Sequence, residues 1–88
     1  MVHPRLIGEG SVVTQEERHL ILADRHIAET ESRIERQRAL LAGRRAAGAY
    51  TAAAEELLVG LEESLTLARQ HRLLIVREID RRARLQGA

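Results

Sequence analysis

The sequence predicts an all-α fold: a long antiparallel helical hairpin of coiled-coil type, which pairs with a second copy to form a homodimeric four-helix bundle. Two observations predict it. In the first half of the chain, aliphatic residues recur every seven positions, at Leu20, Ile27, Ile34 and Leu41, which is the spacing of a helix that buries one narrow stripe. The second half carries a wider apolar face, and Gly48 lies between the halves, where a turn is needed.

Residues 1–13 differ in composition from the rest, and we expect them to form a flexible N-terminal arm. They hold the only proline and two of the six glycines, which favour turns over helix. Their apolar runs are too short for the core of a signal peptide, and no run of 18 apolar residues occurs in the chain. We therefore expect a cytoplasmic protein that does not enter a membrane.

The first helix is predicted over about residues 15–46. Thr14 and Glu17 match a capping box, in which the threonine hydroxyl accepts from the backbone N–H of Glu17 and the carboxylate of Glu17 accepts from the backbone N–H of Thr14. Gly43 and Gly48 can both adopt the left-handed conformation that ends helices, and we place the turn near Gly48.

The second helix is predicted over about residues 52–84, with Thr51 as its N-cap. One apolar face, interrupted by Arg72, comprises Leu58, Leu61, Leu65, Ala68, Ile75 and Ile79. A rotation of about 100° per residue puts Leu57 at the edge of this face and Leu67, Leu74 and Leu85 on a second stripe. The narrow first helix cannot cover both stripes. We therefore expect Leu57, Leu67, Leu74 and Gly60, which permits close approach of another helix, to form the self-association interface.

Antiparallel pairing about Gly48 gives a register that shape and charge both favour. It seats Leu20 between Ile75 and Ile79, and Leu41 between Ala54 and Leu58, as knobs in holes. The acidic start of the second helix then faces the arginine-rich end of the first, and the acidic start of the first helix faces the arginine-rich end of the second. Parallel helices would bring like charges together.

Composition narrows the classes of function. The chain has no cysteine, which excludes disulfides and cysteine-based zinc sites, and Tyr50 is its only aromatic residue. Fourteen arginines against thirteen acidic residues give no strong basic excess for a nucleic acid or an anionic membrane. No catalytic residues, metal site or cofactor are predicted. We expect a non-enzymatic structural or protein-interaction module that binds a second copy of itself or another protein.

Asp24, His71 and Arg72 form the most notable polar group, because the register places Asp24 beside both residues of the second helix. We interpret them as a polar layer that sets register and partner choice. The alternative is an acid–base pair in a small enzyme cleft, but no nucleophile or oxyanion-hole loop accompanies it. His19 and His26 lie seven residues apart on one helix, too far to share a metal ion.

An arginine cluster near the C-terminus suggests a second hypothesis, a weak nucleic-acid-associated regulator that binds through phosphate contacts. The cluster comprises Arg69, Arg72, Arg77, Arg81, Arg82 and Arg84. Glu78 and Asp80 lie among these arginines, and the facing helix begins with acidic residues, so the local field is largely neutralised. Protein binding is therefore the favoured hypothesis.

Two blocks of the sequence carry a resemblance to known proteins. The first runs from Leu22 to Glu29 (LADRHIAE) and continues at residues 33–38 (RIERQR). The second comprises residues 54–58 (AEELL), 61–65 (LEESL) and 70–72 (QHR). With these blocks the chain resembles short uncharacterised two-helix proteins of alphaproteobacteria, to which no activity is assigned. The resemblance covers most of both predicted helices and implies the hairpin, with no site residue to carry over.

Overall fold

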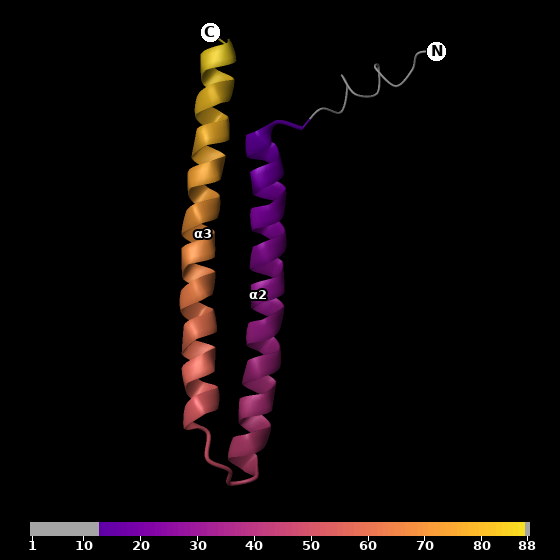
Figure 1. Cartoon of the computed structure of the whole chain (residues 1–88), viewed down its shortest axis with the longest axis vertical. Coiled ribbons are helices and arrows are strands. Elements are labelled where there is room, and N and C mark those ends of the chain that lie inside the picture. The colour runs from indigo at the N-terminus through magenta and orange to yellow at the C-terminus, as the bar shows by residue number, and fades with distance from the viewer. Residues whose placement is uncertain (1–12, 88) are drawn as a thin grey trace, which may run out of the picture.

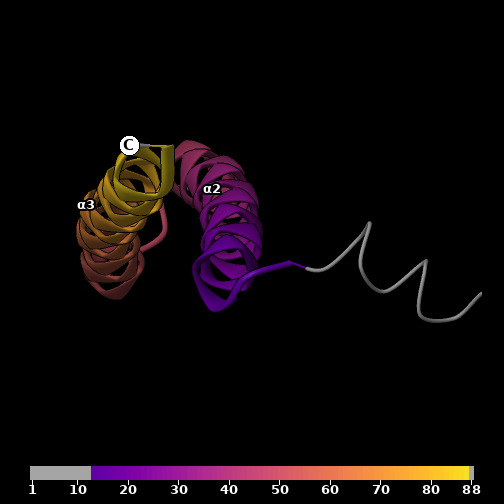
Figure 2. The same ribbon diagram turned by 90° about the horizontal axis from the view of Figure 1, so that it is seen from above.

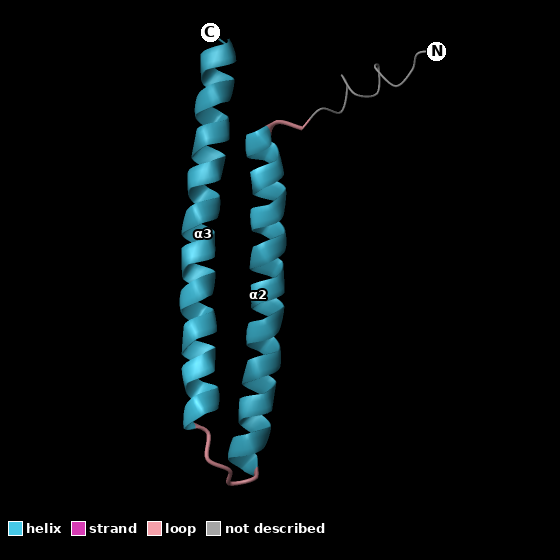
Figure 3. Ribbon diagram, in the orientation of Figure 1, coloured by secondary structure: helices cyan, strands magenta, loops and turns pink. Residues whose placement is uncertain are grey.

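The computed structural model describes residues 13–87, which form two long helices joined by a tight turn (Figures 1 and 3). Helix α2 spans Gln15–Ala46, and helix α3 spans Ala52–Gly87. The part of the chain that the structure describes is therefore a helical hairpin without strands. The N-terminal arm expected from the sequence lies, apart from Val13, outside the described residues.

The ends of α2 are fixed by local hydrogen bonds. At its start, the backbone N–H of Glu17 donates to the hydroxyl of Thr14 at 3.1 Å, and the backbone N–H of Thr14 donates to the carboxylate of Glu17 at 2.9 Å, which completes the capping box. At its end, Gly48 has a φ of +75°, and the N–H groups of Gly48 and Ala49 donate to the carbonyls of Arg45 and Arg44. These bonds form the left-handed termination that glycine favours, and α2 continues through Gly43.

Helix α3 begins at Ala52, as the sequence predicts, but its end differs from the prediction. Thr51 directly precedes the helix, but its hydroxyl donates to the carboxylate of Glu55 at 2.8 Å. This hydrogen bond, together with one from Arg45, lowers the pKa of Glu55. At the other end, the helix continues three residues beyond the predicted end at Arg84 and reaches Gly87.

The two helices lie side by side (Figures 1 and 2), and a thin line of buried side chains runs between them. The buried apolar residues are Ile34 and Leu41 of α2 and Ala54, Leu61 and Ile75 of α3. Leu20, Ile27, Leu58, Leu65 and Ile79 are partly buried along the same line. The seven-residue stripe of α2 therefore packs on the first apolar face of α3, as the sequence predicts.

Thr30 is a polar residue within this line, and it is almost fully buried. Its hydroxyl donates to the carbonyl of His26, one turn earlier in α2, at 2.8 Å. Gln37, at the next polar position of the stripe, donates across the hairpin to the carbonyl of Ala54 at 3.2 Å. Both polar groups are thus satisfied inside the seam, at little cost to the core.

Candidate interaction surface

One side of the hairpin is closed by ion pairs that cross from helix to helix, and we call it the ladder side. Its α2 residues, Asp24, Glu31, Arg38 and Arg45, recur every seven positions and bind Arg72, Arg69, Glu62 and Glu55 of α3 in that order. In each helix the two acidic residues precede the two arginines along the chain, so an antiparallel alignment sets every acidic residue against an arginine. The pattern matches only the antiparallel alignment, so the ladder selects helix orientation.

At the open end of the hairpin, Arg82 joins both helices. Its guanidinium binds Glu16 of α2 at 3.1 Å and Glu78 of α3 at 2.7 Å, and Glu78 also binds Arg81 at 2.7 Å. Hydrogen bonds from Arg81 and Arg82 lower the pKa of Glu78 to about 2. The termini of the described hairpin are therefore held together by a charged network.

The opposite side of the hairpin, which we call the open side, presents leucines and histidines. Its exposed leucines are Leu22 and Leu40 of α2 and Leu57, Leu67, Leu74 and Leu85 of α3. Leu40 and Leu57 line one shallow groove together with Arg33 and Arg36. Leu22 lines a second groove with His19, His26 and His71. The two sides thus differ in chemistry, since charge covers one seam and apolar side chains flank the other.

The four residues predicted for self-association all lie on the outer surface of α3. Leu57, Leu67 and Leu74 remain 50%, 65% and 62% exposed. Gly60 is also exposed, and a Cβ added there would meet no atom within 4 Å. The hairpin itself therefore gives Gly60 no neighbour that requires a glycine. These positions stay available for a partner.

The structure brings together only two of the three residues predicted as a polar layer. Arg72 donates to Asp24 at 2.5 Å, and with side chains 43% and 52% exposed the pair lies at the surface. His71 lies instead in the groove with His19 and His26, on the open side. The register places residues along the axis correctly, but Asp24 and His71 flank the seam on opposite sides. The sequence-based pairing of Asp24 with His71 is therefore not formed.

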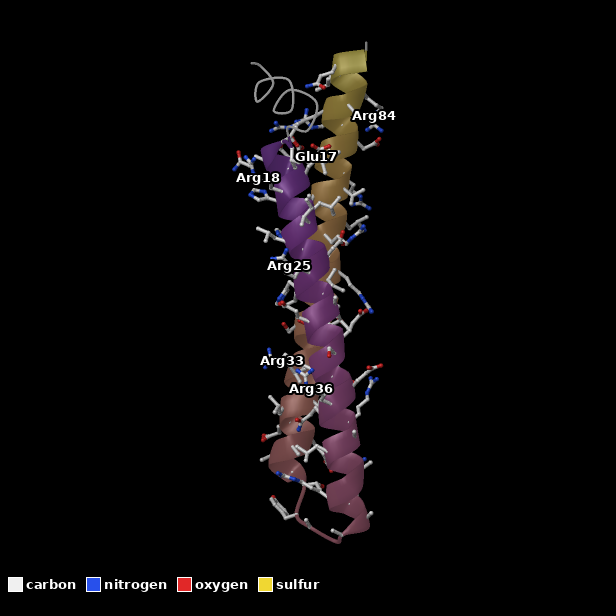
Figure 4. The ribbon with its side chains drawn as sticks, turned by 90° about the vertical axis from the view of Figure 1, so that its right-hand side faces the viewer. Glu17, Arg18, Arg25, Arg33, Arg36 and Arg84 are labelled. Carbon is white, nitrogen blue, oxygen red and sulfur yellow. The ribbon has the colours of Figure 1, made fainter. Side chains whose placement is uncertain are left out.

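Most arginines of the C-terminal cluster bind neighbouring carboxylates. Arg69, Arg72, Arg81, Arg82 and Arg84 each take part in an ion pair, including that of Arg84 with Asp80. Sequence reasoning missed a different set, Arg18, Arg25, Arg33 and Arg36, which point outward from α2 (Figure 4). The seven-residue step from Arg18 to Arg25 and the one-turn step from Arg33 to Arg36 could have revealed it.

Exposed apolar residues also occur away from the open side, at Ile21, Val59 and Leu73. Each stands beside a charge of its own helix. Ile21 is three residues before Asp24, Val59 shares a shallow hollow with Glu55, Glu56 and Glu63, and Leu73 follows Arg72. These scattered residues interleave with charges and form no continuous stripe.

Residues 13–87 place no group of three histidine, cysteine or carboxylate side chains where they could jointly hold a metal ion. Neither α2 nor α3 contains a stretch sufficiently long and apolar to cross a lipid bilayer. Comparisons with protein-family models, with curated proteins and with solved structures find no match to the chain.

Proposed function

We propose that the chain is a non-enzymatic self-association module, in which the open side packs against a second copy to form a homodimeric four-helix bundle. The observation that carries this proposal is the asymmetry of the hairpin. The ladder side closes its seam with four cross-helix ion pairs, whereas the open side leaves six leucines in water. Exposed apolar surface of this kind on a small chain is typical of a protein–protein contact.

The thin core of the hairpin supports the same proposal. Fixing the backbone of one residue costs roughly 1–2 kcal/mol, and burying one leucine or isoleucine returns about 1.5–3 kcal/mol. Only Ile34, Leu41, Ala54, Leu61 and Ile75 are buried apolar residues in the described hairpin, although each helix is about 50 Å long. A second layer of helices buries the remaining leucines and supplies the core that two helices lack.

The test compares two neighbouring leucines of α3. Leu74 lies on the open side, and the rotation of about 100° per residue turns the neighbouring Leu73 towards the ladder side. Leu73 serves as the matched control, since both leucines are exposed and of equal size. A Leu74→Glu substitution places a charge in the proposed contact, so we expect the dissociation constant of the dimer to rise at least about tenfold. Leu73→Glu should leave it unchanged.

Light scattering gives the molar mass of each variant, and circular dichroism gives its helicity at the same concentrations. Loss of the dimer in Leu74→Glu alone, with or without loss of helix, supports the proposal. Equal molar masses for both variants would contradict it. A wild-type chain that is monomeric alone but shifts in mass with a different protein would assign the open side to that protein.

A further inference from the structure

We infer that the two copies pair α3 against α3 in antiparallel orientation, about a two-fold axis near Gln70 and His71, so that the two turns lie at opposite ends of the dimer. This inference rests on the proposed self-association and adds its geometry. It rests on two rows of residues on α3, one mainly apolar and one charged. When the α3 helix of a second copy runs in the opposite direction, each row comes level with residues that complement it.

The first row follows the open side of α3 with alternating steps of three and four residues, the spacing of a second packing stripe beside the buried one. Its members are Leu57, Gly60, Ser64, Leu67, His71, Leu74, Glu78, Arg81 and Leu85. The leucines at its centre and ends are about half exposed or more. The row therefore has the spacing and the exposed leucines of a surface that packs against another helix.

Reversal of this row about Gln70 and His71 brings leucine level with leucine. Leu67 comes level with the partner's Leu74, and Leu57 with the partner's Leu85. Gly60 comes level with the partner's Arg81, where the absence of a side chain leaves space for a long one. The antiparallel pairing thus buries all four leucines of the row in a self-complementary interface, as two-fold symmetry requires.

The exposure of Leu85 also supports the antiparallel pairing. The last turns of α3 extend beyond the start of α2 (Figure 1), and Leu85 there is 65% exposed. The hairpin thus leaves most of the Leu85 side chain uncovered. The partner's Leu57, brought to that level by the reversed helix, covers it.

The second row flanks the first and carries charge in the required order. Glu56, Glu63, Gln70, Arg77 and Arg84 recur every seven residues and are all exposed. Antiparallel pairing sets Glu56 near the partner's Arg84 and Glu63 near the partner's Arg77, with Gln70 near its own copy. Within residues 13–87, Glu56, Glu63 and Arg77 take part in no ion pair. Their charges are available to a partner.

Parallel pairing of α3 with α3 sets like charges together along the helix, and pairing α3 with the partner's α2 does so at one end. Parallel pairing of α3 with α3 sets Glu63 against the partner's Glu63 and Arg77 against the partner's Arg77. Pairing α3 with the partner's α2, both turns at one end, sets Arg77 and Arg81 near the partner's Arg18, since the Glu16–Arg82 bond fixes the relative levels of the helices. Like charges so placed oppose association.

The experiment is disulfide cross-linking of single-cysteine variants, which the chain permits because it has no cysteine of its own. Under mild oxidation of the full-length protein, Gln70→Cys should form a covalent dimer, since the two-fold axis places this position beside itself. Glu63→Cys should not cross-link with itself but should do so when mixed with Arg77→Cys. Leu73→Cys, exposed on the ladder side of α3 at nearly the same level, is the matched control and should stay monomeric on a non-reducing gel.

The outcomes separate the two proposals. A wild-type chain that is monomeric by light scattering overturns both. A wild-type dimer in which Glu63→Cys cross-links with itself, or in which Gln70→Cys fails to cross-link while still dimeric, overturns the antiparallel α3 pairing and leaves self-association standing. The expected pattern, Gln70→Cys alone and Glu63→Cys with Arg77→Cys, supports both.

Discussion

Arg82 and Glu16 join the end of one helix to the beginning of the other, with 3.1 Å between the guanidinium and the carboxylate. Arg82 is oriented for this bond by Glu78, which lies one turn before it and also binds Arg81. Contacts between the ends of a hairpin lie farthest from the turn, so they contribute to closing the whole length of the seam. The stability of the hairpin should therefore depend on the charge of Glu78.

The first prediction concerns the stability of the hairpin at acidic pH. The folded state holds the pKa of Glu78 at about 2, below the ordinary value of 4.5. A carboxyl group whose pKa is lower in the folded state stabilises that state, and its full contribution is present above the pKa of the unfolded chain. The contribution is lost as the pH falls towards the folded-state pKa. We therefore expect the free energy of unfolding to fall between about pH 5 and pH 2, and to fall less steeply in Glu78→Gln.

Urea unfolding followed by circular dichroism across this pH range measures the difference. Glu29→Gln is the control, since Glu29 is exposed and takes part in no ion pair within residues 13–87. Identical pH slopes for the wild type and Glu78→Gln would show that the arginine bonds of Glu78 are absent in solution.

The second prediction compares two isoleucines of α2. Ile34 is 4% exposed in the seam, whereas Ile21 is 51% exposed. Ile34→Ala should lower the free energy of unfolding by about 2–5 kcal/mol because it leaves a cavity, and Ile21→Ala by less than about 0.5 kcal/mol. Chemical denaturation at one fixed protein concentration measures both. Equal losses would mean that α2 buries a different face.

The third prediction tests the ladder. Arg38 binds Glu62 at 2.8 Å, with both side chains partly exposed. Arg38→Glu sets two acidic groups together and should destabilise the hairpin by up to about 1 kcal/mol, and the added Glu62→Arg should restore most of that loss. Urea midpoints of the two single variants and the double variant form the test cycle. A double variant with the sum of the two single losses would show no pairing between these positions.

The fourth prediction contrasts two glycines. Gly48 adopts a φ of +75°, while Gly43 lies within α2 and a Cβ there would meet no atom within 4 Å. Gly48→Ala should cost about 1–2 kcal/mol because of left-handed backbone strain, whereas Gly43→Ala should stabilise by up to about 1 kcal/mol through helix propensity. Thermal unfolding distinguishes the signs. Stabilisation by Gly48→Ala would place the turn elsewhere.

The fifth prediction concerns His71, the central residue of the proposed α3 contact. It is exposed in the hairpin and shares a groove with His19, His26 and Leu22. His71→Leu adds apolar surface at the two-fold axis and should lower the dimer dissociation constant about tenfold or more. Sedimentation equilibrium measures it. A weaker dimer would mean that the imidazole makes a polar contact that the pairing requires.

The hairpin could be predicted from the sequence because strong local signals agree with its long-range pattern. Thr14 and Glu17 mark the start of α2, Gly48 marks the turn, and Ile34 and Leu41 mark the buried stripe. Once the turn is placed, the chain geometry fixes the levels of facing residues, so the Arg38–Glu62 and Arg45–Glu55 contacts follow from the charge pattern.

The side of the seam on which a residue lies was harder to predict. Asp24 and His71 fall at neighbouring levels, but a difference of about 100° in rotation per residue decides which flank each one takes. The register fixes only the level of each residue along the axis and leaves its rotation open. Because the rotation turns His71 to the open side, Asp24 binds Arg72 alone. Thr51 precedes α3 as predicted, but its hydroxyl uses its proton to bind the carboxylate of Glu55.

The molar mass of the unmodified chain in solution tests the central claim most directly. Sedimentation equilibrium over a concentration series, with circular dichroism on the same samples, should give a species of twice the 9.9 kDa chain mass, with helicity that falls together with the dimer on dilution. A monomer that keeps its full helicity at every concentration would contradict the account, because the exposed leucines of α3 would then need no cover.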